Sequence, residues 1–176
     1  MFFMNKYVSL LRGINVGGHK RVPMADLRKL LEKHGYKNVK TVLASGNVVY
    51  ESDEGKIGQI GEILEKAFGF NIPVITIPFE AIEEIVASDP FGEVKVTPRM
   101  KLYVTFLKNK PEVKIQLPYV SADDSFKIPG ITENAIFSYV DLEKTGTLDA
   151  MDFLEKEFGK ELTTRNYNTV VKIAGL

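Results

Sequence analysis

The sequence predicts an α+β fold with two similar units in succession, each an antiparallel sheet with helices packed on one face. Residues 5–78 spell strand, helix, strand, strand, helix, strand, which is the order of a ferredoxin-like βαββαβ unit. Residues 100–176 repeat this order less clearly and without residue identity to the first half. The 176-residue chain is 44% hydrophobic and 26% charged, which suits a globular protein with a sizeable core.

The first half carries a signal for each of its elements. Pro23 suits the first position of a helix and Gly35 its end, and apolar residues between them recur at helical spacing. Ser45-Gly46-Asn47 predicts the tight turn of a hairpin, and Pro73 predicts that the last strand lies at a sheet edge. Strands are expected at 7–11, 39–43, 48–50 and 72–77, and helices over 24–34 and 57–68.

The second half is less sharply marked. Prolines at both ends weaken the prediction of a short helix over 111–118. Pro129-Gly130 and the residues after it are expected to turn a hairpin. The other expected elements are strands at 101–107, 125–128, 135–140 and 161–164, and helices near 82–86, 147–158 and 167–174. The predicted domains are 1–87, a first unit with its following helix, and 100–176, a second unit with a C-terminal helix, joined by a linker at 88–99.

Charge and composition exclude several classes of protein. The formal net charge is zero, but residues 12–40 carry eight Lys/Arg against two acids, whereas residues 51–93 carry ten acids against two Lys. The absence of cysteine excludes disulfides and thiolate chemistry, and two widely spaced histidines do not make a metal site. No run approaches the roughly 20 apolar residues that span a bilayer. We expect a cytoplasmic protein without a membrane partner, either monomer or weak homodimer.

The stretch from Ser9 to Arg21 looks most like a binding site, because glycines and cations follow an apolar strand and precede a helix. In a split βαβ unit, the loop 13–22 and the turn 44–47 lie at the same end of the sheet. Glycines let the backbone approach a ligand, and a helix N-terminus with cations nearby favours an anion. The alternative is a plain connecting loop with solvated charges. The candidate ligand-binding residues are Arg12, Gly13, Asn15, Gly17, Gly18, Lys20, Arg21, Ser45 and Asn47.

This loop departs from the two common phosphate-binding motifs. Gly13 and Gly18 have the spacing of a P-loop, but His19 stands where that motif has lysine, and Lys20, followed by Arg21, stands where serine or threonine is expected. A dinucleotide fingerprint needs another glycine spacing and an acid about 20 residues further on. No cofactor and no catalytic residue is assigned, and His19 is the only candidate general base.

A second polar concentration spans Thr163 to Thr169. A threonine or asparagine there suits the cap of the last helix. Arg165, Asn166 and Asn168 complete the list of candidate ligand-binding residues, on the hypothesis that the second unit folds back to place Arg165 beside Arg12.

Four stretches make the sequence similar to a known family. They are Leu10-Leu11-Arg12-Gly13-Ile14-Asn15-Val16-Gly17-Gly18, Pro23-Met24 with Leu27, Ala44-Ser45-Gly46-Asn47-Val48-Val49, and Thr163-Thr164-Arg165-Asn166-Tyr167-Asn168-Thr169-Val170. The chain resembles the bacterial domain-of-unknown-function family 1697 over nearly its whole length, with Tyr167 where tryptophan is expected. The resemblance implies a cytoplasmic α+β protein with two ferredoxin-like units and no established activity.

Three functions remain open at this point. The first is binding of a small anionic ligand, phosphate- or nucleotide-like, at the Gly13–Arg21 loop. The second is nucleic-acid binding by the basic 12–40 segment together with Tyr7 and Tyr50, which lie on strands that a ferredoxin-like sheet places centrally. The third is a protein-interaction module without catalytic activity. Whether the protein is an enzyme is not determined by these residues.

Overall fold

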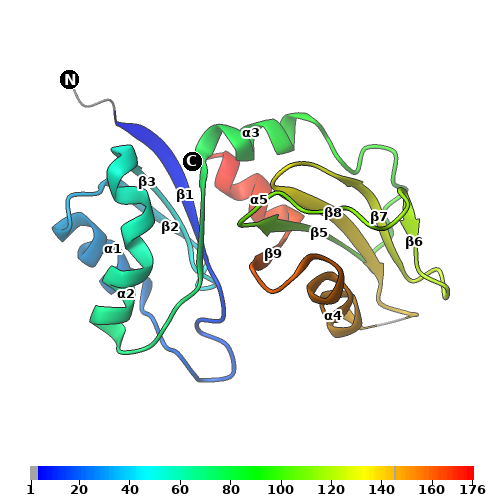
Figure 1. Cartoon of the computed structure of the whole chain (residues 1–176), viewed down its shortest axis with the longest axis horizontal. Coiled ribbons are helices and arrows are strands. Elements are labelled where there is room, and N and C mark those ends of the chain that lie inside the picture. The colour runs from blue at the N-terminus through cyan, green and yellow to red at the C-terminus, as the bar shows by residue number, and fades with distance from the viewer. Residues whose placement is uncertain (1–3, 145) are drawn as a thin grey trace. The chain divides into compact units, whose positions relative to one another are not determined.

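The computed structural model describes residues 4–144 and 146–176 and contains two compact units (Figure 1). The first comprises the described residues up to Glu84 together with Lys172–Leu176, and the second comprises Ile85–Val171. The fold is α+β: the described residues form two antiparallel sheets and five α-helices. None of the described helices has the length and apolar character that crossing a bilayer requires.

The first unit contains a four-stranded sheet in the order β2-β3-β1-β4, with every neighbouring pair antiparallel. β1 and β2 therefore run parallel with β3 between them, and β4 lies at an edge, as Pro73 predicted. The elements are β1 (Asn5–Leu11), α1 (Met24–Lys33), β2 (Lys37–Val42), β3 (Asn47–Ser52), the 3₁₀ helix η1 (Glu54–Gln59), α2 (Ile60–Phe68) and β4 (Val74–Pro78), followed by α3 (Phe79–Ala87), which contains the unit boundary.

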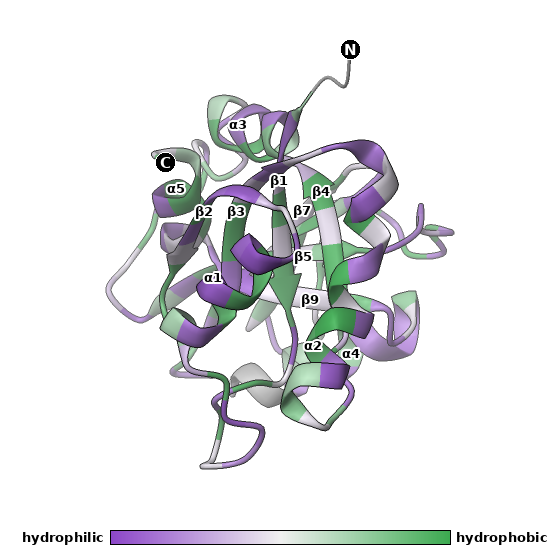
Figure 2. Cartoon of the chain, turned by 90° about the vertical axis from the view of Figure 1, so that its left-hand side faces the viewer, coloured by the Kyte–Doolittle hydropathy of each residue, from purple (hydrophilic) through white to green (hydrophobic). Residues whose placement is uncertain are grey.

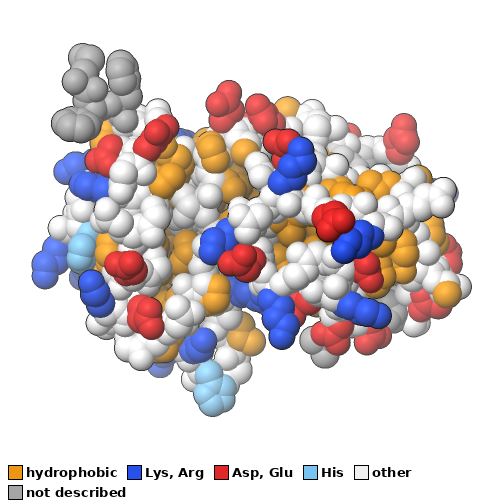
Figure 3. All heavy atoms as spheres, viewed as in Figure 1, with side chains coloured by type: hydrophobic (Ala, Val, Ile, Leu, Met, Phe, Trp, Pro, Cys, Tyr) orange, Lys and Arg blue, Asp and Glu red, His pale blue; other side chains and the backbone are white. Residues whose placement is uncertain are grey.

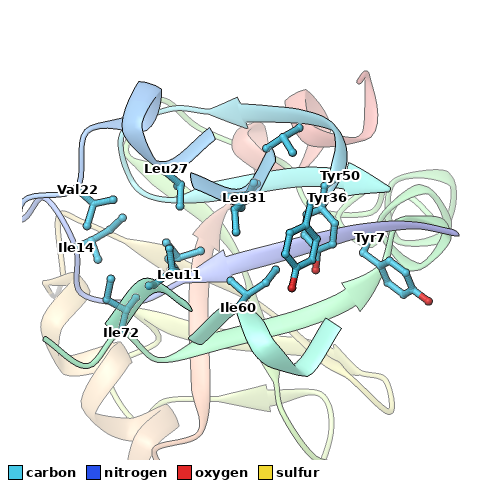
Figure 4. Packing of buried hydrophobic residues seen from close by; sticks show 13 residues of the cluster. Tyr7, Leu11, Ile14, Val22, Leu27, Leu31, Tyr36, Tyr50, Ile60 and Ile72 are labelled. Atoms are coloured by element: carbon cyan, nitrogen blue, oxygen red, sulfur yellow. The ribbon is translucent and has the colours of Figure 1, made fainter. Parts of the chain in front are cut away.

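Both α1 and α2 cover one face of this sheet, and the strands they cover are largely apolar (Figure 2). Leu27 and Leu31 lie one helical turn apart on α1 and are fully buried against the sheet. Ile60 and Leu64 are buried in the same way on α2. Burial of each such side chain contributes about 1.5–3 kcal/mol to stability. Figure 4 shows this layer, which runs from Ile14, Val22 and Ile72 at one end to Tyr7 at the other.

The second unit contains a five-stranded sheet in the order β6-β7-β8-β5-β9, again antiparallel throughout. One face packs against α4 in a core that includes Ile128, Ile136 and Leu154. The elements are β5 (Met100–Leu107), β6 (Tyr119–Val120), β7 (Phe126–Ile131), β8 (Ala135–Asp141), α4 (Thr147–Phe158) and β9 (Leu162–Asn166), followed by α5 (Tyr167–Ala174), which contains the other unit boundary.

One expectation for the second unit is wrong, and another holds only in part. Residues 111–118 form no helix, because the prolines at both ends restrict the backbone and the apolar residues alternate instead of following helical spacing. The hairpin is turned by the residues after Pro129-Gly130, between Ile131 and Ala135, and not by Pro129-Gly130 itself. That dipeptide lies inside β7, where the pairing with β8 shifts register between Lys127 and Gly130, and such a bulge tolerates a proline that cannot donate to the ladder.

The segment between α3 and β5 contains neither helix nor strand, but one of its side chains is well packed. Phe91 is buried, and its ring centroid lies 5.0 Å from that of Tyr167 and 6.2 Å from that of Phe137, both in edge-to-face arrangements. These contacts fix the segment within the second unit.

Candidate functional site

The loop after β1 and the turn between β2 and β3 lie together at one end of the first unit. The Leu11 N–H donates to the Gly46 carbonyl at 2.8 Å, and the Asn15 side-chain amide donates to the Ala44 carbonyl at 2.8 Å. The side chain of Ile14 packs directly over Gly46. The convergence of these two segments, predicted from the order of the elements, is confirmed.

A third segment, residues 69–73 before β4, reaches the same end of the unit. The Arg12 N–H donates to the Pro73 carbonyl at 2.9 Å, and the Lys20 ammonium donates to the Asn71 carbonyl at 3.2 Å. Lys20 also lies 5.9 Å from the centre of the Phe70 ring. The sequence prediction missed this segment, although an edge strand antiparallel to β1 must begin where β1 ends.

Asn15 fixes the shape of the loop with its own side chain. Its amide nitrogen donates to the carbonyls of Val22 at 2.9 Å and Ala44 at 2.8 Å, while its amide oxygen accepts from the Val22 N–H at 2.8 Å. Both amide hydrogens are thereby used. Asn15 thus joins the two ends of the loop 15–22 and ties them to the turn after β2.

The outer part of the loop is a tight turn at Val16-Gly17-Gly18-His19. The His19 N–H donates to the Val16 carbonyl at 3.2 Å, and Gly17 and Gly18 have φ angles of 61° and 78°. Two successive positive φ angles are typical of a type I′ turn, where glycine is favoured. Val16 is 71% exposed at this tip.

Several backbone N–H groups of the loop point to no acceptor in the described part of the chain. Asn15 and Lys20 have the uncommon φ angles of 55° and 47°, and Gly13 also lies in the left-handed region. Successive N–H groups in an αR–αL or turn conformation form the nest arrangement that binds anions in proteins. Among the residues that the structure describes, none accepts from the N–H of Gly13, Gly17 or Gly18.

Cationic side chains occur in the same segments as these N–H groups. The three segments, 12–23, 43–47 and 69–73, contain Arg12, Lys20, Arg21 and His19 but no Asp or Glu. Figure 3 shows blue and pale-blue side chains at the lower end of the first unit, where Figure 1 places the loop after β1. Residues 16–21 are exposed, so these charges face solvent. The adjoining α1 begins after Pro23 without a side-chain cap.

The turn residues Ser45 and Asn47 bond to each other and to the end of β2. The Asn47 amide donates to the Val42 carbonyl at 2.7 Å and to the Ser45 hydroxyl at 3.1 Å, and Asn47 is fully buried. Gly46 lies between them with a φ of 86°. These contacts shape the turn, in which Ala44 and Ser45 are exposed whereas Gly46 and Asn47 are buried.

The other three predicted ligand-binding residues lie at the boundary of β9 and α5. The buried Arg165 guanidinium donates to the Thr163 hydroxyl at 2.8 Å and the Thr164 carbonyl at 3.0 Å, and burial lowers the Arg165 pKa to about 10. The Asn166 side chain accepts from the Asn168 N–H at 2.9 Å, which caps α5. The hypothesis that Arg165 lies beside Arg12 stays a prediction.

The aromatics proposed to stack nucleic-acid bases are in the core. Tyr7 and Tyr50 are 5% and 0% exposed and belong to the cluster under α1 and α2. Base stacking needs an open aromatic face, so neither ring can provide it in this structure. Within the described residues, no three His, Asp or Glu side chains are grouped so that they could hold a metal ion.

The fold and this loop define the class of protein to which the chain belongs, an α+β protein with two antiparallel sheets and a glycine-rich loop after its first strand. The chain belongs to a family described as a protein of unknown function (DUF1697), whose model matches residues 4–137. A conserved bacterial protein from Streptococcus pneumoniae has a similar structure, with a TM-score of 0.68, 19% sequence identity and coverage of 98% of both chains. That likeness concerns the fold alone. No curated protein matches the sequence.

Proposed function

We propose that the protein binds a small phosphate-like anion on the loop from Gly13 to Arg21. One observation carries the proposal: the backbone N–H groups of Gly13, Gly17 and Gly18, which have no acceptor among the described residues, occur in the same loop as Lys20 and Arg21, on segments without a carboxylate. N–H groups and cations are the donors that bind phosphate oxygens in proteins.

The backbone contributes a preorganised set of donors. Because the Asn15 side chain already joins Val22 and Ala44, the loop does not need to order itself when a ligand arrives. The uncapped start of α1 adds a favourable field for negative charge. Asn15 and Asn47 act in this proposal by holding the loop and the turn, and Ser45 offers an exposed hydroxyl.

The side chains contribute charge in an open site. Lys20 is tethered to the Asn71 carbonyl at 3.2 Å, which keeps its ammonium beside the loop, and Arg21 follows it in the chain. Exposed ion pairs typically contribute about 0.2–1 kcal/mol each, so the affinity should be modest and should fall with salt.

The test is a titration of the ¹⁵N-labelled protein with inorganic phosphate, followed by amide chemical shifts. We expect concentration-dependent shifts at Gly13, Gly17 and Gly18, and their loss in the double variant Lys20→Ala, Arg21→Ala. Arg28→Ala removes an exposed cation from the outer face of α1 and serves as the matched control. Shifts that are absent, or unchanged in the double variant, would contradict the proposal.

We also propose that both units are ferredoxin-like. The order β2-β3-β1-β4 is that of a split βαβ unit, and β7-β8-β5-β9 has the same order of equivalent strands. The second unit differs because a loop with β6 replaces the helix between its first two equivalent strands.

A further inference from the structure

We infer that the phosphate group bound at the Gly13–Arg21 loop is bound without a divalent metal ion, so that the ligand is a free phosphomonoester or pyrophosphate-type anion and not a magnesium nucleotide. The inference rests on the proposed function of the loop. It narrows that function because it excludes magnesium-bound nucleotides, which are the substrates of most nucleotide-dependent phosphoryl transfer.

The first argument is the set of oxygen donors. Magnesium in phosphate sites is held by one or two carboxylates or a hydroxyl together with the phosphate oxygens. The segments 12–23, 43–47 and 69–73 contain no Asp or Glu, and Ser45 has their only side-chain hydroxyl. The next acid along the chain, Asp26, is exposed on the first turn of α1. A metal ion at the loop would thus have few protein ligands.

The second argument is the identity of residue 20. A P-loop with its glycines at the positions of Gly13 and Gly18 has serine or threonine at position 20, and its hydroxyl binds magnesium. Lys20 stands there in this chain, followed by Arg21, and both side chains are exposed. A guanidinium supplies positive charge and up to two parallel hydrogen bonds to phosphate oxygens, which a metal ion supplies elsewhere. Magnesium bound to the ligand would then compete with Arg21 for the same oxygens.

The test uses inorganic pyrophosphate as the probe and isothermal titration calorimetry of the full chain in EDTA and in excess magnesium. We expect binding in EDTA and an apparent affinity that falls about two- to fivefold in magnesium, because magnesium pyrophosphate carries less negative charge. Binding that requires magnesium, or is strengthened by it, would overturn the inference while leaving the proposed function intact. No pyrophosphate binding in either condition would overturn both.

Two variants make the test specific to the loop. Arg21→Gln should weaken binding in EDTA and reduce the magnesium effect, whereas Arg28→Ala should change neither. Ser45→Asp adds one carboxylate to the turn, so it should weaken binding in EDTA and make magnesium restore part of the affinity. A Ser45→Asp protein that still loses affinity in magnesium would contradict the argument from oxygen donors, and its amide spectrum would verify that it is folded.

Discussion

At the scale of single residues, Gly46 has the strictest requirement in the turn after β2. Its φ angle is 86°, and a Cβ atom built there would lie 2.8 Å from both the Leu11 Cβ and the Ile14 Cδ1. Gly69, at the C-terminal end of α2, has a similar φ of 81° but no heavy atom within 4 Å of such a Cβ. The two glycines therefore separate the cost of the backbone angle from the cost of crowding.

The Gly46→Ala substitution should destabilise the protein by about 2–4 kcal/mol, because the left-handed angle and the overlap both oppose a methyl group. Gly69→Ala should cost only about 1–2 kcal/mol, since only the angle opposes it. Urea denaturation followed by circular dichroism measures both. Equal losses would show that the crowding at Gly46 relaxes at no cost.

Ser138 and Ser9 make a second contrast at this scale. Ser138 is fully buried in β8, and its hydroxyl has no hydrogen-bond partner among the described residues. Ser9 is equally buried in β1, but its hydroxyl bonds to the Tyr50 hydroxyl at 2.9 Å and the Thr76 hydroxyl at 2.7 Å. The same residue type is therefore satisfied in one sheet and not in the other.

Replacing Ser138 by alanine should leave stability unchanged or raise it by up to about 1 kcal/mol, because a buried hydroxyl without a partner opposes folding. Ser9→Ala should cost about 1–3 kcal/mol, because Tyr50 and Thr76 lose a shared partner. Thermal unfolding of the two variants beside the parent protein measures the difference. A clear loss of stability in Ser138→Ala would reveal a bond that the structure does not contain.

At the scale of elements, Tyr36 joins the turn after α1 to η1. Its hydroxyl donates to the Lys56 carbonyl at 2.7 Å, and its ring meets that of Tyr50 edge to face at 5.1 Å. Figure 4 shows the two rings side by side. Burial raises the Tyr36 pKa to about 12, with smaller contributions in the same direction from Tyr50 and Asp53.

This raised pKa predicts an alkaline loss of stability. The fold favours the neutral phenol, so the contribution of Tyr36 is complete below the unfolded-state pKa of about 10 and is lost as pH rises toward about 12. Urea midpoints measured between these limits should fall with pH, and they should fall less steeply in Tyr36→Phe, which cannot ionise. Equal slopes would show that Tyr36 does not carry the effect.

The elements of the first unit could be predicted from sequence because each has a local signal, such as Pro23 before α1 or Ser45-Gly46-Asn47 between β2 and β3. The second unit offered weaker signals, and a bulge that admits Pro129 looks like a turn until the partner strand is known. The convergence of two loops followed from strand order alone. The hydrogen bonds of Asn15 and Asn47 could not be predicted, because an asparagine that shapes a loop and one that binds a ligand look the same in sequence.

At the scale of the whole molecule, Lys172–Leu176 belong to the first unit although they end the chain. Ile173 in this segment is fully buried, whereas its neighbour Val171, which belongs to the second unit, is 42% exposed. Ile173 and Val171 both lie on α5, so substitutions at these two positions compare a buried with an exposed side chain of the same helix.

Ile173→Ala should reduce stability by about 2–5 kcal/mol, the usual cost of a large-to-small change in a core. Val171→Ala should change it by less than about 0.5 kcal/mol. Hydrogen–deuterium exchange should show the protection of β1 and β4 falling in Ile173→Ala more than that of β5 and β8. The reverse pattern would contradict the assignment of this segment to the first unit.

The discontinuity of the first unit also sets an order of events during synthesis. Ribosomes release a chain from its N-terminus, and domains generally fold as units as they emerge. Here every residue of Ile85–Val171 leaves the ribosome before Lys172–Leu176, so the second unit is complete while the first still lacks its last piece. The unit that begins first is therefore the one that finishes last, because Lys172–Leu176, which include the buried Ile173, leave the ribosome after the whole second unit.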